Sequence, residues 1–174
     1  MTARADNIYI TRGLIVGTKS KKIHKPVDDN THEWSVYVQS PFSTSLDYIQ
    51  NVVFKLHETF DEPVVTKTYP FEVKKKGWGE FTIQIRINFV DPNEKPLNLL
   101  QTLVLHDGVI NEDGFLVSER YEEIVFRSPT ITMLKYLKDH EVKPDEFLQE
   151  ELKERELIDS ALEQMVQKFD ELDM

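Results

Sequence analysis

Apolar and polar side chains alternate along most of residues 1–127, which is the pattern of β-strands with one buried face. The clearest run has five apolar residues at every second position from Phe81 to Phe89. Similar runs cover residues 34–38, 52–56 and 97–105, and weaker candidates cover 8–16, 64–69 and 116–126. We therefore predict a series of short, half-buried strands.

Turn-forming residues (Asp, Asn, Gly and Pro) separate these runs. Seven or eight short strands at this spacing predict an all-β fold, an immunoglobulin-like antiparallel β-sandwich followed by C-terminal helices. Trp34 suits the buried core of such a sandwich. The chain contains no cysteine, which excludes the disulfide-linked antibody type.

The apolar spacing changes to a helical one after residue 127, the end of the predicted sandwich domain (1–127). Ser128 and Pro129 predict the start of a short helix, since Pro is favoured at the first helical position, and residues 128–143 form this helix and a linker. Residues 144–174 predict an amphipathic helix with acids in its first turn. Its apolar stripe ends in two heptads, too few for a lone coiled coil, so we expect it to pack on the domain, a second copy or another protein.

The net charge of −10 is concentrated at the C-terminus, where residues 145–174 hold 11 acidic and 3 basic residues. Residues 1–144 hold 20 acidic and 18 basic residues, and this near neutrality argues against direct DNA binding, whose affinity depends on phosphate neutralisation. We interpret two lysine clusters as solvated loops rather than contacts to DNA or acidic partners: Lys19, Lys21, Lys22 and Lys74, Lys75, Lys76. No apolar stretch approaches the roughly 18 residues of a membrane helix, so no membrane partner is expected.

Five blocks of the sequence resemble the YEATS domain family and occur in the family's order. They are His32–Val38, Val53–Phe60, Gly77–Phe81, Phe89–Pro96 and Val117–Phe126. The Trp between two glycines and the helical C-terminal segment are most similar to one subfamily. That subfamily is shared by a histone-acetyltransferase complex and a remodelling complex that exchanges variant histones.

The resemblance implies a sandwich whose end loops clamp an acetylated or crotonylated lysine of a histone tail, in a subunit of a nuclear chromatin complex that needs no cofactor or metal. Seven positions match the family's pocket: His57, Thr59, Phe60, Gly77, Trp78, Gly79 and Phe81. By this resemblance Trp78 and Phe60 sandwich the acyl group, and Thr59 hydrogen-bonds its amide. His57 borders the acyl chain and orients the Thr59 hydroxyl.

The residue chemistry supports such a pocket, because an acylated lysine is a neutral amide on an apolar stem and is best held between aromatic faces. Trp78 lies in a turn between glycines, where core packing does not explain it, so we favour a functional role. Phe81 is in phase with the core positions that follow it, and core packing is as good an interpretation as ligand contact. His32 has no such neighbours, and we interpret it as a solvated residue.

Two other functions stay open. In the first, the protein is a scaffold that acts mainly through its C-terminal helix, and the pocket is incidental. In the second, it is an enzyme in which His57, Glu58 and Glu80 supply acid–base chemistry. The sequence lacks a nucleophile elbow, metal-ligand spacing and a phosphate loop, so we predict that the protein is not an enzyme. We interpret the acidic turn at residues 91–96 as a rigid connector rather than a metal site.

Overall fold

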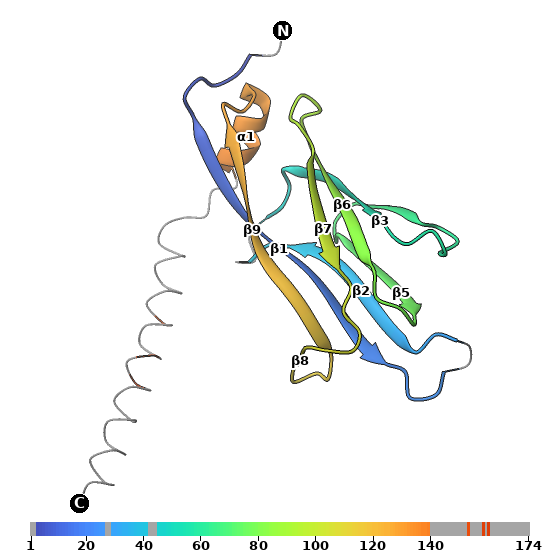
Figure 1. Ribbon diagram of the computed structural model, residues 1–174. Coiled ribbons are helices and arrows are strands. Elements are labelled where there is room, and N and C mark those ends of the chain that lie inside the picture. The colour runs from blue at the N-terminus through green and yellow to red at the C-terminus, as the bar shows by residue number, and fades with distance from the viewer. Residues whose placement is uncertain are drawn as a thin grey trace, which may run out of the picture. The chain divides into compact units, whose positions relative to one another are not determined.

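A computed structural model describes residues 3–26, 29–41 and 45–139, together with the single helical residues Lys153, Ile158 and Ser160 (Figure 1). The chain divides into two compact units, residues 1–140 and 141–174, and each is described by itself. Among the described residues, no helix is long and apolar enough to cross a membrane.

The first unit is built from strands that pair antiparallel throughout, which confirms the predicted all-β sandwich. The strands in the described residues are β1 (Tyr9–Lys22), β2 (His32–Gln39), β3 (Ile49–Lys55), β4 (Val64–Lys67), β5 (Glu72–Gly77), β6 (Thr82–Phe89), β7 (Leu97–Thr102), β8 (Val109–Ile110) and β9 (Leu116–Arg127). One sheet has the order β5-β2-β1-β9-β8 and the other has the order β4-β3-β6-β7 (Figure 1).

The core lies between the two sheets and follows the alternation seen in the sequence. On β6, Ile83, Ile85 and Ile87 are at most 1% exposed, while the residues between them face solvent or are only partly covered. Trp34 on β2 is 3% exposed, as predicted for a core residue. Each such large apolar side chain contributes roughly 1.5–3 kcal/mol when fully buried, so these strands hold the sandwich together.

The interpretation of the two lysine clusters as loops was wrong, because both clusters lie in strands. Residues 74–76 belong to β5, an edge strand that pairs with β2, and Lys19, Lys21 and Lys22 belong to β1. β5 forms because its backbone pairs with β2 while Phe71 and Val73 turn inward, each 2% exposed. Its lysines are tolerated because an edge strand keeps one side open to water.

The helix α1 (Ile131–Asp139) begins later than predicted. Thr130, not Ser128, caps it: the Met133 N–H donates to the Thr130 hydroxyl oxygen at 3.0 Å. Ser128 has a positive φ of 47°, which lies in the left-handed region that a right-handed helix does not use. The chain therefore turns at Ser128 and Pro129 before the helix starts.

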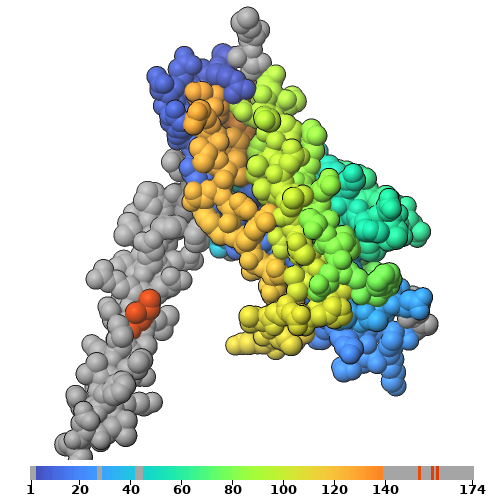
Figure 2. Space-filling view, viewed as in Figure 1, coloured from blue at the N-terminus to red at the C-terminus, as the bar shows by residue number. Residues whose placement is uncertain are grey.

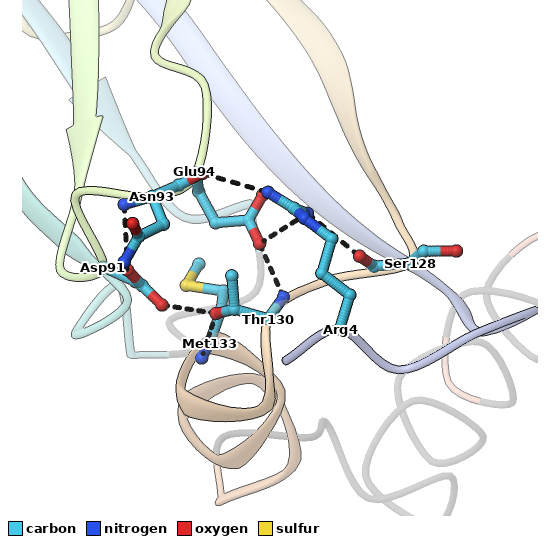
Figure 3. A network of polar contacts seen from close by, with 7 residues as sticks. All are labelled: Arg4, Asp91, Asn93, Glu94, Ser128, Thr130 and Met133. Carbon is cyan, nitrogen blue, oxygen red and sulfur yellow. Dashed lines mark hydrogen bonds and ion pairs between the residues drawn. The ribbon is translucent and has the colours of Figure 1, made fainter. Parts of the chain in front are cut away.

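A buried polar network fixes the start of α1 (Figure 3). The Thr130 hydroxyl donates to Asp91, and the Thr130 N–H donates to Glu94 at 2.7 Å. Arg4 donates to Glu94 at 3.3 Å and to the Ser128 and Asn93 carbonyls, both at 3.0 Å. The acidic turn is thus a connector, as interpreted, and it ties the N-terminal segment to the helix.

The predicted amphipathic helix over residues 144–174 lies almost wholly outside the described residues. Within it, Lys153, Ile158 and Ser160 are helical, and Ile158 is 60% exposed.

Candidate functional site

The predicted pocket residues come from two loops that meet at one end of the sandwich. His57, Thr59 and Phe60 follow β3, whereas Trp78 to Phe81 precede β6. β3 and β6 pair antiparallel with Lys55 opposite Gln84, so the residues after one strand lie beside those before the other. The fold itself therefore brings the two loops together.

An aromatic cluster fixes the inner wall of this region. Phe60 and Phe81 are half-buried, and their ring centroids lie 5.7 Å apart. Both also contact Trp34 edge to face, Phe60 at 5.8 Å and Phe81 at 5.7 Å. These separations suit attractive aromatic pairs, so the buried Trp34 holds Phe60 in place. Phe81 packs against the hydrophobic core and is also part of this cluster, so its position is compatible with both core packing and ligand contact.

A tight turn positions the polar groups beside Phe60. The Thr59 hydroxyl lies 3.0 Å from His57 Nδ1, and the Phe60 N–H donates to the His57 carbonyl at 3.2 Å. The Thr59 N–H also approaches Nδ1, at 3.4 Å, so we assign that ring nitrogen as an acceptor. The Thr59 hydroxyl then donates to His57 and keeps its lone pairs for an N–H group from outside. Both side chains are exposed to solvent.

The Gly77–Trp78–Gly79 segment lies next to the aromatic cluster. A Cβ at Gly77 would lie 3.2 Å from Trp34 Nε1 and 3.9 Å from Phe60 Cζ, so this backbone runs close to the Phe60 ring. Trp78 follows directly and is 68% exposed. A Cβ at Gly79 would meet nothing within 4 Å. The segment therefore carries a large, exposed aromatic surface beside a buried one, with open space around it.

Sequence interpretation missed His32, which is 6% exposed rather than solvated. Its ring meets His106 edge to face at 5.2 Å, and its Nδ1 lies 2.8 Å from the Thr31 hydroxyl. Burial, followed by the charges of His106 and Lys22, lowers the pKa of His32. The signal was present, because His32 is in phase with Trp34 and Val36 on the inward face of β2.

Glu80 was also missed as a structural element of the loop. Its Oε1 accepts the Leu105 N–H at 2.6 Å and the His106 N–H at 3.1 Å. These bonds, chiefly the one from Leu105, hold the pKa of the Glu80 carboxyl below its usual range. Figure 2 shows the segment that follows β7 (yellow) toward the lower end of the first unit, and the Glu80 bonds join this segment to the loop before β6.

The arrangement does not form an acid–base pair. The Glu80 carboxylate is engaged by backbone N–H groups, and His57 is engaged by Thr59. In the described part of the chain, no three His, Asp or Glu side chains are grouped so as to hold a metal. The surface grooves nearby, of about 830 and 560 Å³, flank the glycine segment and include neither Phe60 nor Trp78.

Comparison with known proteins identifies a family. The model of the YEATS family matches residues 29–107. The AF-9 homolog of Kluyveromyces lactis is 42% identical over 151 residues, which cover 74% of this chain and 69% of that protein. The AF-9 homolog of Emericella nidulans is 38% identical, but the chain spans only 55% of its length.

Solved structures agree with these sequence matches. The crystal structure of the Yaf9 YEATS domain bound to H3K27ac has a TM-score of 0.69 and 36% identity, covering 79% of this chain and 99% of that one. The Yaf9 YEATS domain recognizing an H3K122suc peptide has a TM-score of 0.67 and 37% identity, covering 79% and 98%. The YEATS domain is a non-catalytic reader domain, which confirms the prediction that the chain is not an enzyme. By its fold and by these matches, the chain belongs to the YEATS family.

Proposed function

We propose that this protein is a chromatin reader that binds acetylated or crotonylated lysine on a histone tail between Phe60 and Trp78. The observation that carries the proposal is the pairing of a fixed aromatic wall with exposed hydrogen-bonding groups. Phe60 is held by Trp34 and Phe81, and the Thr59 hydroxyl lies beside it. The Yaf9 structures with H3K27ac and H3K122suc support it, because their ligands carry acylated lysines.

In this proposal each pocket residue has a physical role. The Thr59 hydroxyl accepts the amide N–H of the acylated lysine, since its own proton is donated to His57. The backbone N–H groups of the Gly77–Trp78–Gly79 segment receive the amide oxygen, because glycines permit close approach. Leaving either amide group buried without a partner would cost about 1–3 kcal/mol, so these contacts select an amide over a free ammonium group.

Peptide titration tests the proposal. We expect fluorescently labelled histone H3 peptides with an acetylated or crotonylated lysine to bind with a Kd in the micromolar to millimolar range. Trp78→Ala and Phe60→Ala should each weaken this binding at least tenfold. Tyr9→Ala is the matched control, because Tyr9 is an aromatic residue that is 61% exposed. It begins β1, whereas the site lies near the other end of β1, where Lys22 pairs with His32. Equal affinity for the unmodified peptide would contradict the proposal.

We further propose that the protein is a nuclear subunit of a chromatin complex and that residues 144–174 dock it to other subunits. The proposed division is a sandwich domain at 1–127, a short helix and linker at 128–143, and this docking helix. The helical state and exposure of Ile158 support it. Deletion of residues 145–174 should abolish recovery of partner subunits while leaving peptide binding intact. If recovery survives the deletion, the docking role is wrong.

If Trp78→Ala leaves chromatin targeting unchanged while the deletion abolishes it, the protein is a scaffold with an incidental pocket.

A further inference from the structure

The loop that carries Trp78 is anchored on both sides but not at its centre. On one side the Gly77 carbonyl accepts the Thr31 N–H at 3.1 Å. On the other, the Phe81 carbonyl accepts the Leu103 N–H at 2.9 Å. Between these anchors, Trp78 is flanked by two glycines and its ring is 68% exposed. Packing therefore does little to orient the ring, and its position depends on how tightly the backbone ends are held.

Glu80 supplies a third anchor, the nearest one after Trp78. One carboxylate oxygen binds two consecutive backbone N–H groups, from Leu105 at 2.6 Å and from His106 at 3.1 Å. Both donors lie beyond the end of β7, which stops at Thr102. A charged acceptor makes shorter and stronger hydrogen bonds than a neutral one. The bonds thus join the loop before β6 to the segment after β7.

The environment of Glu80 favours its ionised form. The bond from the Leu105 N–H is the main cause that lowers the pKa of Glu80, and the nearby His106 and His32 rings, which contact each other edge to face at 5.2 Å, contribute less. His32 is the first residue of β2, is 6% exposed and pairs with Gly77. The buried His32 ring therefore contacts His106, one of the two residues whose backbone N–H groups bind the Glu80 carboxylate.

We propose that Glu80 is a positioning residue for the reader pocket: its carboxylate ties the Trp78 loop to Leu105 and His106 and so holds the Trp78 ring as the second aromatic wall. The inference rests on the proposed function only for the identity of the ligand. Without this tie, the two glycines let the loop sample other conformations, and only the fraction with Trp78 in place binds ligand.

The experiment uses the full chain with three variants, Glu80→Ala, Glu80→Gln and Glu112→Ala. Glu112 is an exposed loop acid and serves as the matched control. The ¹⁵N heteronuclear NOE is measured for the backbone of Trp78 and Gly79 and for the indole of Trp78. The buried Trp34 serves as the reference against which these values are compared. Affinity for the acetyl-lysine histone H3 peptide is measured by fluorescence anisotropy on the same samples.

We expect Glu80→Ala to lower the NOE of Trp78 and Gly79 but not that of Trp34, and to weaken peptide binding roughly tenfold, because the competent fraction falls. Glu80→Gln keeps a neutral acceptor and should retain binding within about threefold of the wild type. Glu112→Ala should match the wild type. If Glu80→Ala does not fold, Glu80→Gln takes its place. Its neutral acceptor is weaker than a carboxylate, so the Trp78 NOE should fall relative to that of Trp34, and a Trp78 NOE equal to the wild-type value would overturn the inference.

The two proposals fail differently. If no acylated peptide binds the wild type while Glu80→Ala still mobilises Trp78, the reader function is wrong and the positioning role stands. If the wild type binds and Glu80→Ala changes neither the Trp78 NOE nor the affinity, the positioning role is wrong and the reader function stands.

Discussion

The polar network at the start of α1 predicts a large effect from a very small change, Thr130→Val. The substitution keeps the shape of the side chain and removes only the hydroxyl. Thr130 is 0% exposed and Asp91 is 3% exposed, so water does not replace the lost group. Two interactions disappear: the bond donated to Asp91 and the cap accepted from the Met133 N–H.

The magnitude follows from these two losses. Removing an N-cap costs about 1 kcal/mol. Removing a hydrogen bond to a charged group costs about 1.5–3 kcal/mol. Val fills nearly the same volume, so no cavity adds to the cost, and Asp91 keeps its bonds from the Asn93 N–H and side-chain amide at 2.9 and 2.8 Å. We expect a loss of about 2–4 kcal/mol in the free energy of unfolding.

Urea unfolding followed by circular dichroism measures this loss, with Thr11→Val as the control because Thr11 lies exposed on β1. The denaturation midpoint should fall by about 1–2 M at an unchanged slope of roughly 2 kcal/mol/M. A loss below about 1 kcal/mol, or one equal to that of the control, would refute the reasoning.

The pH dependence gives a second check on the same variant. The Thr130 hydroxyl is the main cause that holds the pKa of Asp91 below its ordinary value of 3.8. The stability from ionised Asp91 is therefore present above pH 3.8 and is lost as the pH falls through the lower folded pKa. The difference in stability between wild type and Thr130→Val should narrow below about pH 4.

Two further predictions concern the β-sandwich. Burial lowers the pKa of His32 below 6.5, so the unfolded state binds a proton more readily than the folded state. The free energy of unfolding should therefore fall as the pH drops from 6.5 toward the lowered pKa. His32→Gln should flatten this decline, and a pH profile of urea unfolding equal to that of the wild type would contradict the prediction. A Cβ at Gly17 would lie 2.7 Å from Glu119 Cγ and 2.8 Å from the Tyr37 ring. Gly17→Ala should therefore lower the free energy of unfolding by about 1–3 kcal/mol through overpacking. A melting temperature equal to that of the wild type would show that the Tyr37 ring moves aside without cost.

The sequence predicted the elements whose burial alternates cleanly. β6 is an example, because its period-2 pattern records directly which side chains face the other sheet. β5 escaped prediction because three consecutive lysines mask the inward alternation of Phe71 and Val73. Its strand conformation comes from pairing with β2, a partner about forty residues away in the chain, and periodicity does not report such pairing.

The site shows the same limit. The proposed pocket residues are predicted by resemblance alone, since they lie in short blocks of the sequence that resemble the family. His32 keeps the phase of Trp34 on the inward face of β2, but its imidazole is polar, and side-chain polarity alone favours an exposed position. The sequence indicates Glu80 only as a candidate acid–base group. Its partners are backbone N–H groups of Leu105 and His106, and a bond to backbone leaves no trace in the partner's side-chain identity.

The two walls of the proposed pocket differ in how they are held, and this difference has a consequence for affinity. Phe60 is fixed by packing on Trp34 and Phe81, so it costs little to hold when a ligand arrives. Trp78 is exposed, and in the part of the chain that the structure describes its loop is held through neighbouring backbone groups and Glu80, so any ordering of its ring on binding is subtracted from the affinity. Changes that stiffen the Trp78 loop should therefore strengthen binding, whereas changes that stiffen the Phe60 side should have little effect.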